Sequence, residues 1–189
     1  DQGRFQKNGR IELPTSDARD VAAADLNNDG ATDIVFTNHQ QAGNRLTESY
    51  IYWGGTKGFS AERRQGLHTV GAWGTSIADL NQDGLADIVI SNYKAHYSYE
   101  VPSYVYWNSK DGFYNSRRTS LFTRGAVGNR VADFNGDGHL DLLVGGYSSR
   151  VTRVLPAKLF HGDGQRIDLD HPVEIHADSP FQIMPYDLN

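Results

Sequence analysis

The sequence predicts an all-β fold, a β-propeller built of four-stranded antiparallel blades. Three observations predict it: a 54-residue repeat, four short strand-like segments in each repeat, and a composition with 20 Gly and 11% aromatic residues among 189. Four short antiparallel strands in about 50 residues are typical of a propeller blade, whereas stacked solenoids usually have shorter repeats. The 189 residues make about 3.5 repeats, so we expect residues 1–189 to form a partial propeller domain.

An acidic segment defines the repeat. It reads DLNNDGATDIVF from Asp25, DLNQDGLADIVI from Asp79 and DFNGDGHLDLLV from Asp133, and a fourth copy starts at Asp187 and is truncated there. The first aspartates therefore recur at one constant 54-residue interval. The same register aligns the aromatic segments SYIYWGG, SYVYWNS and AKLFHGD at residues 49–55, 103–109 and 157–163. Because no insertion or deletion is needed, the repeat is established from the sequence alone.

The strands of one repeat can be located in the second unit. They are predicted at residues 74–78, 87–91, 104–107 and 117–122. β-Branched and aromatic residues dominate these runs, and Gly, Asn, Asp and Pro separate them. The small residues before each acidic segment suit an innermost strand, where neighbouring blades crowd together near the propeller axis.

The same strand order has a consequence for the two ends of the chain. It predicts an outermost strand near residues 10–13 and an innermost strand near residues 181–186. Both would belong to incomplete blades. We therefore expect the remaining blades to come from a longer chain, beyond Asn189 and before Asp1.

The acidic segment predicts a calcium site in each repeat. Positions 1, 3, 5 and 9 are Asp, Asn, Asp and Asp, Gly follows position 5, and position 7 can offer its backbone carbonyl. Calcium prefers six to eight oxygen ligands, and Gly permits the sharp turn. The predicted ligands are Asp25, Asn27, Asp29, Ala31 and Asp33, then Asp79, Asn81, Asp83, Leu85 and Asp87, then Asp133, Asn135, Asp137, His139 and Asp141.

The alternative is that these segments are only turns, because Asn, Asp and Gly favour turns without a metal. A turn needs one or two such residues, however, and three converging carboxylates repel unless a cation or protons neutralise them. Magnesium fits less well because it demands octahedral geometry and retains its waters. About three structural calcium ions are therefore expected.

The DxNxDGxxD loop follows a small-residue strand, and a YxYW segment recurs further along the repeat. This pattern resembles the FG-GAP (VCBS-type) repeats of integrin α-subunit propellers and of related bacterial and fungal proteins. The resemblance implies a seven-bladed ring with calcium in the hairpin between the first and second strands of each blade. It also implies a ligand face opposite these hairpins and the binding of proteins or glycans outside the cell.

Candidate ligand-binding residues lie on the connections predicted at that opposite face. These connections run over residues 38–47, 92–102 and 146–156. We consider the tyrosines of the middle connection because Tyr offers a large contact area and a polar tip, although they could instead pack between blades. The candidates are Trp73, assigned to a blade-entry connection, with Tyr93, His96, Tyr97, Tyr99, Arg150 and Arg153. Trp53 and Trp107 recur in phase with His161 and are predicted to pack between blades.

Composition and missing motifs narrow the function. The absence of Cys excludes disulfides, zinc–thiolate sites and a Cys nucleophile. A net charge of −5 argues against nucleic-acid binding, and no apolar run is long enough for membrane insertion. There is no HExxH or GxSxG motif. We expect a calcium-stabilised extracellular, secreted or cell-surface module that binds a glycan or protein and is not an enzyme. The alternatives are a polysaccharide lyase or dehydratase propeller and a structural subunit of a surface assembly.

Overall fold

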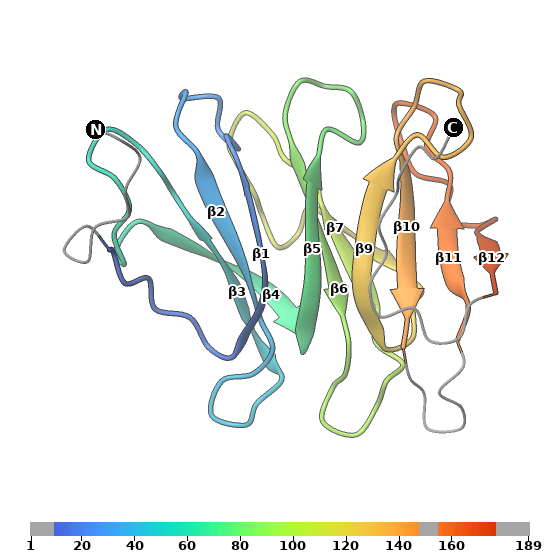
Figure 1. The fold of residues 1–189 in the computed structure, drawn as a ribbon, viewed down its shortest axis with the longest axis horizontal. Helices are drawn as coiled ribbons and strands as arrows, with labels where there is room; N and C mark the ends of the chain where they lie inside the picture. The colour runs from blue at the N-terminus through green and yellow to red at the C-terminus, as the bar shows by residue number, and fades with distance from the viewer. Residues whose placement is uncertain (1–9, 148–154, 177–189) are drawn as a thin grey trace.

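The computed structural model describes residues 10–147 and 155–176, and within these ranges the chain is all-β. Twelve strands form three four-stranded antiparallel sheets, and Figure 1 shows the sheets standing next to one another along the molecule. In each sheet every strand pairs with the next one in the chain. The three sheets are the predicted propeller blades. No helix in the described part of the chain has the length and apolar character needed to cross a membrane.

The strands follow the 54-residue register. The first blade contains β1 (Ala18–Ala24), β2 (Asp33–Asn38), β3 (Leu46–Tyr52) and β4 (Arg64–Val70). The second contains β5 (Ala72–Ala78), β6 (Asp87–Asn92), β7 (Ser103–Tyr106) and β8 (Arg118–Leu121). The third contains β9 (Ala126–Ala132), β10 (Asp141–Gly146), β11 (Ala157–Phe160) and β12 (Val173–Ile175). The four strands predicted for the second repeat are confirmed within two residues at each end.

The first strands of the blades, β1, β5 and β9, lie side by side, as Figure 1 shows. Small residues permit this approach. A Cβ atom added at Gly74 would lie 2.8 Å from the carbonyl oxygen of Val127 in the next blade. Asp20, which stands at the equivalent position of β1, instead accepts a hydrogen bond from the Thr75 backbone N–H at 2.9 Å. The inner strands are therefore joined directly by backbone and side-chain contacts.

Each inner strand also contains a β-bulge at the same repeat position. The ladder skips Arg19 in β1, Trp73 in β5 and Val127 in β9. A bulge leaves its extra residue unpaired and redirects the side chain. The sequence interpretation that placed Trp73 in a connection is therefore wrong, because Trp73 lies within β5 at this bulge.

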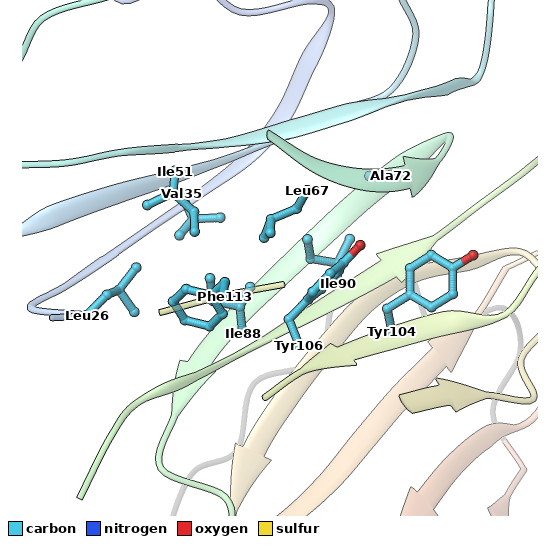
Figure 2. Packing of buried hydrophobic residues seen from close by; sticks show 10 residues of the cluster. All are labelled: Leu26, Val35, Ile51, Leu67, Ala72, Ile88, Ile90, Tyr104, Tyr106 and Phe113. Carbon is cyan, nitrogen blue, oxygen red and sulfur yellow. The ribbon is translucent and has the colours of Figure 1, made fainter. Parts of the chain in front are cut away.

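The hydrophobic core lies between adjacent blades. Figure 2 shows the first cluster, in which Leu26, Val35, Ile51 and Leu67 of the first blade face residues of the second blade. A second cluster joins the second and third blades in the same way. Trp53 packs against the first cluster and Trp107 against the second, which agrees with the predicted packing of these side chains between blades.

Residues 10–13 do not form the predicted outermost strand. They lack the backbone ladder that defines a strand. The next residue, Pro14, nevertheless lies where such a strand would lie, because the Tyr52 hydroxyl donates to its carbonyl. One repeat later, the Tyr106 hydroxyl donates to the carbonyl of His68 in β4. The strand predicted near residues 181–186 and the fourth acidic loop at Asp187 lie outside the described residues.

Candidate metal loops and candidate ligand face

The two ends of the blades carry different groups of loops. The acidic loops join β1 to β2, β5 to β6 and β9 to β10, and Figure 1 shows all three at its upper end. The connections from β2 to β3 and from β6 to β7 lie at the lower end. The predicted separation of the acidic loops from the candidate ligand connections is therefore present in the structure.

Side chains at positions 1, 3 and 5 wrap each acidic loop around its own backbone. In the first loop Asp25 accepts hydrogen bonds from the N–H groups of Asp29 at 3.2 Å and Gly30 at 2.8 Å. Asn27 accepts from Asp29 at 3.0 Å, and Asp29 accepts from Ala31 at 2.8 Å. The same bonds recur in the second and third loops. The three acidic loops therefore share the same pattern of side-chain to backbone hydrogen bonds.

The aspartate at position 9 connects each loop to the rest of its blade. Asp33, Asp87 and Asp141 are fully buried. Asp87 accepts hydrogen bonds from the N–H groups of Leu80 at 3.1 Å and Asn108 at 2.8 Å. The other two aspartates accept the equivalent bonds. The first donor is in the loop and the second lies just past the third strand, so this carboxylate holds the hairpin against the blade.

Burial makes ionisation of Asp33 and Asp87 unfavourable. It raises the pKa of Asp87 to about 7, and repulsion from Asp83 and Asp79 acts in the same direction, while the two backbone hydrogen bonds oppose it. Burial also raises the pKa of Asp33, with repulsion from Asp29 and Asp25 added. An adjacent cation is the kind of neighbour that would favour the charged form.

The donor chemistry of the loops fits calcium, since each loop offers carboxylate, amide and carbonyl oxygens on one tight turn. Across residues 10–147 and 155–176, however, no group of three or more His, Asp or Glu side chains is already placed to hold a metal ion. The carboxylates are engaged by backbone N–H groups instead. The predicted ligands are thus brought into the same loops, and calcium binding stays a prediction.

Two features of these loops were not predicted. Adjacent loops are joined, because the Asn28 side chain donates to the Gly84 carbonyl at 3.2 Å and Gln82 donates to Gly138 at 3.4 Å. In the third blade, His161 Nδ1 lies 3.2 Å from Asp141 Oδ1. Only the first of these could have been suspected from the sequence, because polar residues occupy loop position 4 twice.

At the opposite end of the blades, aromatic side chains from all three blades meet. We call His39, Trp73, Tyr93, Tyr99 and Tyr147 the aromatic cluster. Trp73 is the bulge residue of β5, and its ring centroid lies 5.1 Å from that of His39 and 5.0 Å from that of Tyr93. Tyr93 lies 5.2 Å from Tyr99 and 6.3 Å from Tyr147. Most of these pairs are edge-to-face, a favourable arrangement for aromatic rings.

The repeat itself positions three members of the aromatic cluster. His39, Tyr93 and Tyr147 occupy the same position in successive repeats. Their backbone N–H groups donate to the carbonyls of Asp17, Gly71 and Gly125, at 3.1, 3.0 and 2.9 Å. These three acceptors have positive φ values of 51, 55 and 54°, a conformation that favours Gly. An equivalent tight corner in each blade therefore brings one aromatic residue to the same place.

Three cations border the aromatic cluster. The Arg19 guanidinium lies 4.8 Å from the centre of the Trp73 ring, and the Lys94 ammonium lies 4.6 Å from that of Tyr99. Arg45 contacts His39 Nε2. Arg19 also pairs with Asp17 at 2.8 Å. In the described ranges, no ion pair involves Arg45 or Lys94.

The protonation states of the cluster follow from burial. Burial, with repulsion from Arg45 and Arg19, lowers the pKa of His39, so its imidazole is neutral at pH 7. Burial and a hydrogen bond with Tyr99 raise the pKa of Tyr93 to about 12, so its phenol keeps its proton. His39 and Tyr93 are thus uncharged, and the positive charge beside them comes from the neighbouring cations.

The predicted ligand residues have three outcomes. Trp73, Tyr93 and Tyr99 come together, while His96 and Tyr97 form a separate pair with ring centroids 4.2 Å apart and Tyr97 72% exposed. Arg150 and Arg153 lie outside the described residues. The alternative that these tyrosines pack between blades holds in part, because Tyr93 contacts rings of both neighbouring blades yet is only half-buried. His39 and Tyr147 were missed, although their 54-residue spacing from Tyr93 could have revealed them.

Comparison with known proteins gives one family. A family model described as FG-GAP-like repeat matches residues 25–90 and residues 79–144. Each match begins at the first aspartate of an acidic loop, and together the two cover more than half of the 189 residues. A search of curated proteins finds no match to the chain.

Proposed function

The chain belongs to the family of FG-GAP-like repeat proteins, and on this basis we propose that it is a calcium-stabilised extracellular propeller module that recognises a glycan. The observation that carries the proposal is the aromatic cluster. Rings from three blades meet on the end of the blades that is free of acidic loops, where a ligand can reach the half-buried rings of Trp73, Tyr93, Tyr99 and Tyr147.

The chemistry of the aromatic cluster suits a sugar. Aromatic rings offer flat apolar surfaces against which the C–H faces of sugars can stack, and phenol hydroxyls can bond to sugar hydroxyls. Trp73, Tyr93, Tyr99 and Tyr147 are all half-buried, so their inner edges are packed while other surface stays accessible. Because the rings are already held by one another, little side-chain entropy is lost on binding. A protein ligand is the alternative outcome for the same surface.

Calcium has a structural role in this proposal. It would be held by the oxygens at positions 1, 3, 5, 7 and 9 of each acidic loop, and when bound it would supply the positive charge that these carboxylates need. The buried position-9 aspartates support this, since burial and neighbouring carboxylates raise the pKa values of Asp33 and Asp87. Calcium at millimolar concentration saturates even weak sites, which favours a location outside the cell.

The surroundings of His39 and His96, the histidines near the aromatic cluster, favour recognition over catalysis. His39 is 3% exposed and its Nε2 atom is engaged by Arg45, so a polymeric substrate has no access to it as a base. His96 is exposed and contacts Tyr97, with no hydrogen bond to its ring among the described contacts. The lyase or dehydratase alternative and the surface-assembly alternative are therefore kept as outcomes of the test.

The test is a glycan-binding screen in calcium with two variants. Trp73→Ala removes the central ring of the cluster, and we expect binding to fall at least about tenfold, which corresponds to about 1.4 kcal/mol. Tyr114→Ala removes an aromatic residue that is 47% exposed on another loop, and it should bind as the parent does. Equal binding by both folded variants, or binding of no glycan at all, would refute the proposal. Release of unsaturated sugar products would instead indicate a lyase.

A further inference from the structure

We propose that the ligand of the aromatic cluster is an acidic glycan, a sugar chain that carries carboxylates, and that Lys94 and Arg45 bind those carboxylates. The inference rests on the proposed glycan recognition and specifies its substrate class. Its basis is the distribution of charge over the two ends of the blades together with the way these two cations are held.

The two ends of the blades carry opposite charge. Each of the three acidic loops contributes three aspartates to one end, although the whole chain has a net charge of only −5. At the other end, Arg19, Arg45 and Lys94 border the aromatic cluster. Asp17 pairs with Arg19, and Glu100, next to Tyr99, pairs with Arg124 at 3.6 Å, so within the described ranges Arg45 and Lys94 are left without a carboxylate partner. A surface whose cations outnumber its carboxylates attracts anions, even on a chain that is acidic as a whole.

Lys94 is positioned by an aromatic ring and has no carboxylate partner in the described ranges. Its ammonium lies 4.6 Å from the centre of the Tyr99 ring, and such a contact holds the charge without neutralising it. The backbone of Lys94 is also close to the tight corner at Gly71, where an added Cβ atom would lie 2.2 Å from the Lys94 carbonyl oxygen. The side chain therefore starts from a fixed point beside the cluster.

Arg45 is held from the other side of the aromatic cluster. One of its guanidinium nitrogens contacts Nε2 of His39, and burial with repulsion from Arg45 keeps this imidazole neutral, as a hydrogen-bond acceptor must be. A guanidinium has five N–H donors, so this contact leaves donors for a carboxylate. In addition, the Gly71 N–H donates to the Arg45 carbonyl at 2.7 Å, which connects both cations to the same corner.

A glycan fits this surface better than an acidic peptide does. Peptides are commonly bound by adding a strand to a sheet edge or by placing a helix in an apolar groove. The aromatic cluster instead stands on strand ends and connections, at Trp73, Tyr93 and Tyr99. Ring faces and phenol hydroxyls beside two cations match a sugar ring that carries a carboxylate.

The experiment measures binding of uronate oligosaccharides in calcium, each compared with its carboxyl-reduced counterpart. We expect at least one uronate to bind about tenfold or more tightly than its neutral counterpart, because a hydrogen bond to a charged group is stronger than one between neutral groups. Its affinity should fall as the salt concentration rises. Lys94→Gln and Arg45→Gln should each remove most of the difference between the acidic and neutral sugars.

Lys57→Gln is the matched control, because it makes the same charge change at an exposed residue between β3 and β4, at the acidic-loop end of the first blade. It should leave binding unchanged. Equal affinity for acidic and neutral sugars, or an unaltered preference in the folded Lys94→Gln and Arg45→Gln variants, would overturn the inference. If neutral glycans bind and Trp73→Ala abolishes that binding, glycan recognition stands and the acidic preference falls. If neither kind of sugar binds, both proposals fall.

Discussion

The hydroxyl of Tyr106 donates a hydrogen bond of 2.5 Å to the backbone carbonyl of His68, and this bond joins the third strand of the second blade to the outermost strand of the first. Arg118 donates to the same carbonyl at 3.2 Å. One repeat earlier, Tyr52 makes the equivalent bond to Pro14. The bond is therefore a repeated feature that sets the spacing between neighbouring blades at their outer side.

Replacing Tyr106 by Phe should lower the free energy of unfolding by at least about 1 kcal/mol, which is typical for loss of one hydrogen bond. The ring is fully buried, so its packing is retained, while the hydroxyl loses its bond to His68 together with its contacts to Asn115 at 3.1 Å and Arg118 at 3.0 Å. Urea unfolding at fixed calcium measures the change. Tyr114→Phe, at an exposed phenol, should have no effect, and equal stabilities for both variants would contradict the assigned role.

Gly74→Ala should destabilise the protein by about 1–3 kcal/mol, the usual cost of overpacking. The new Cβ atom would lie 2.8 Å from the Val127 carbonyl oxygen and 3.0 Å from the Gly128 Cα atom, and backbone of the next blade cannot move aside cheaply. Ala23→Ser adds one atom at an exposed position of an inner strand and should be neutral. Thermal unfolding of the three proteins checks this, and an unchanged melting temperature in Gly74→Ala would show that β5 and β9 are not in tight contact.

Calcium should raise the melting temperature, and a chelator should lower it. Each site contributes about 2.7 kcal/mol when free calcium is a hundredfold above its Kd. The triple variant Asp29→Asn, Asp83→Asn and Asp137→Asn removes one charge from each acidic loop with little change of shape and should lose most of the calcium-induced rise. Asp111→Asn, outside the loops, is the control. A triple variant that responds to calcium as the parent does would refute the proposed ligands.

Acid should destabilise the protein in part through His39. Burial, with repulsion from Arg45 and Arg19, lowers the folded-state pKa of this imidazole below its usual 6.5. As the pH falls below 6.5, His39 binds a proton in the unfolded chain but not in the folded protein, and this difference lowers the free energy of unfolding. Well above that pH, where the imidazole is neutral in both states, the residue contributes no pH dependence.

His39→Gln should therefore lose this contribution, so the free energy of unfolding of the variant relative to the parent should rise as the pH falls from about 7 to about 5, where a His of ordinary pKa takes up its proton. Urea unfolding of the parent and the variant at several pH values measures the difference. His176→Gln, at an exposed residue, should retain the slope of the parent. Parallel curves for His39→Gln and the parent would show that His39 is not held neutral by its surroundings.

Much of the fold could be predicted from local pattern. The 54-residue register located β5, β6, β7 and β8 and placed the acidic loops and the candidate ligand connections at opposite ends of the blades. These features depend on the strand period and on turn residues, both of which can be recognised in the local sequence. The strand expected at residues 10–13 is not present in the structure, and local pattern alone does not show whether a segment finds a backbone partner.

The candidate ligand site was predicted only in part, and the reason lies in its long-range contacts. Tyr93 and Tyr99 drew attention because they are crowded in one segment, whereas His39 and Tyr147 are single aromatic residues in theirs. Their meeting depends on how three blades stand against one another. The position of Trp73 could not be predicted either, because a bulge in β5 sets the direction of its side chain and no sequence motif indicates this bulge.

The sequence by itself therefore determined the repeat, the class of fold, the four strands of a complete blade and the oxygen-rich composition of the three acidic loops, because each is encoded within one repeat. Only the tertiary structure decided which side chains meet between repeats: Lys94 with Tyr99, Arg45 with His39, and Trp73 with Tyr93. The physical reason is that the packing of small residues such as Gly74 against the next backbone sets the distance between blades, and that distance decides which loop residues come into contact.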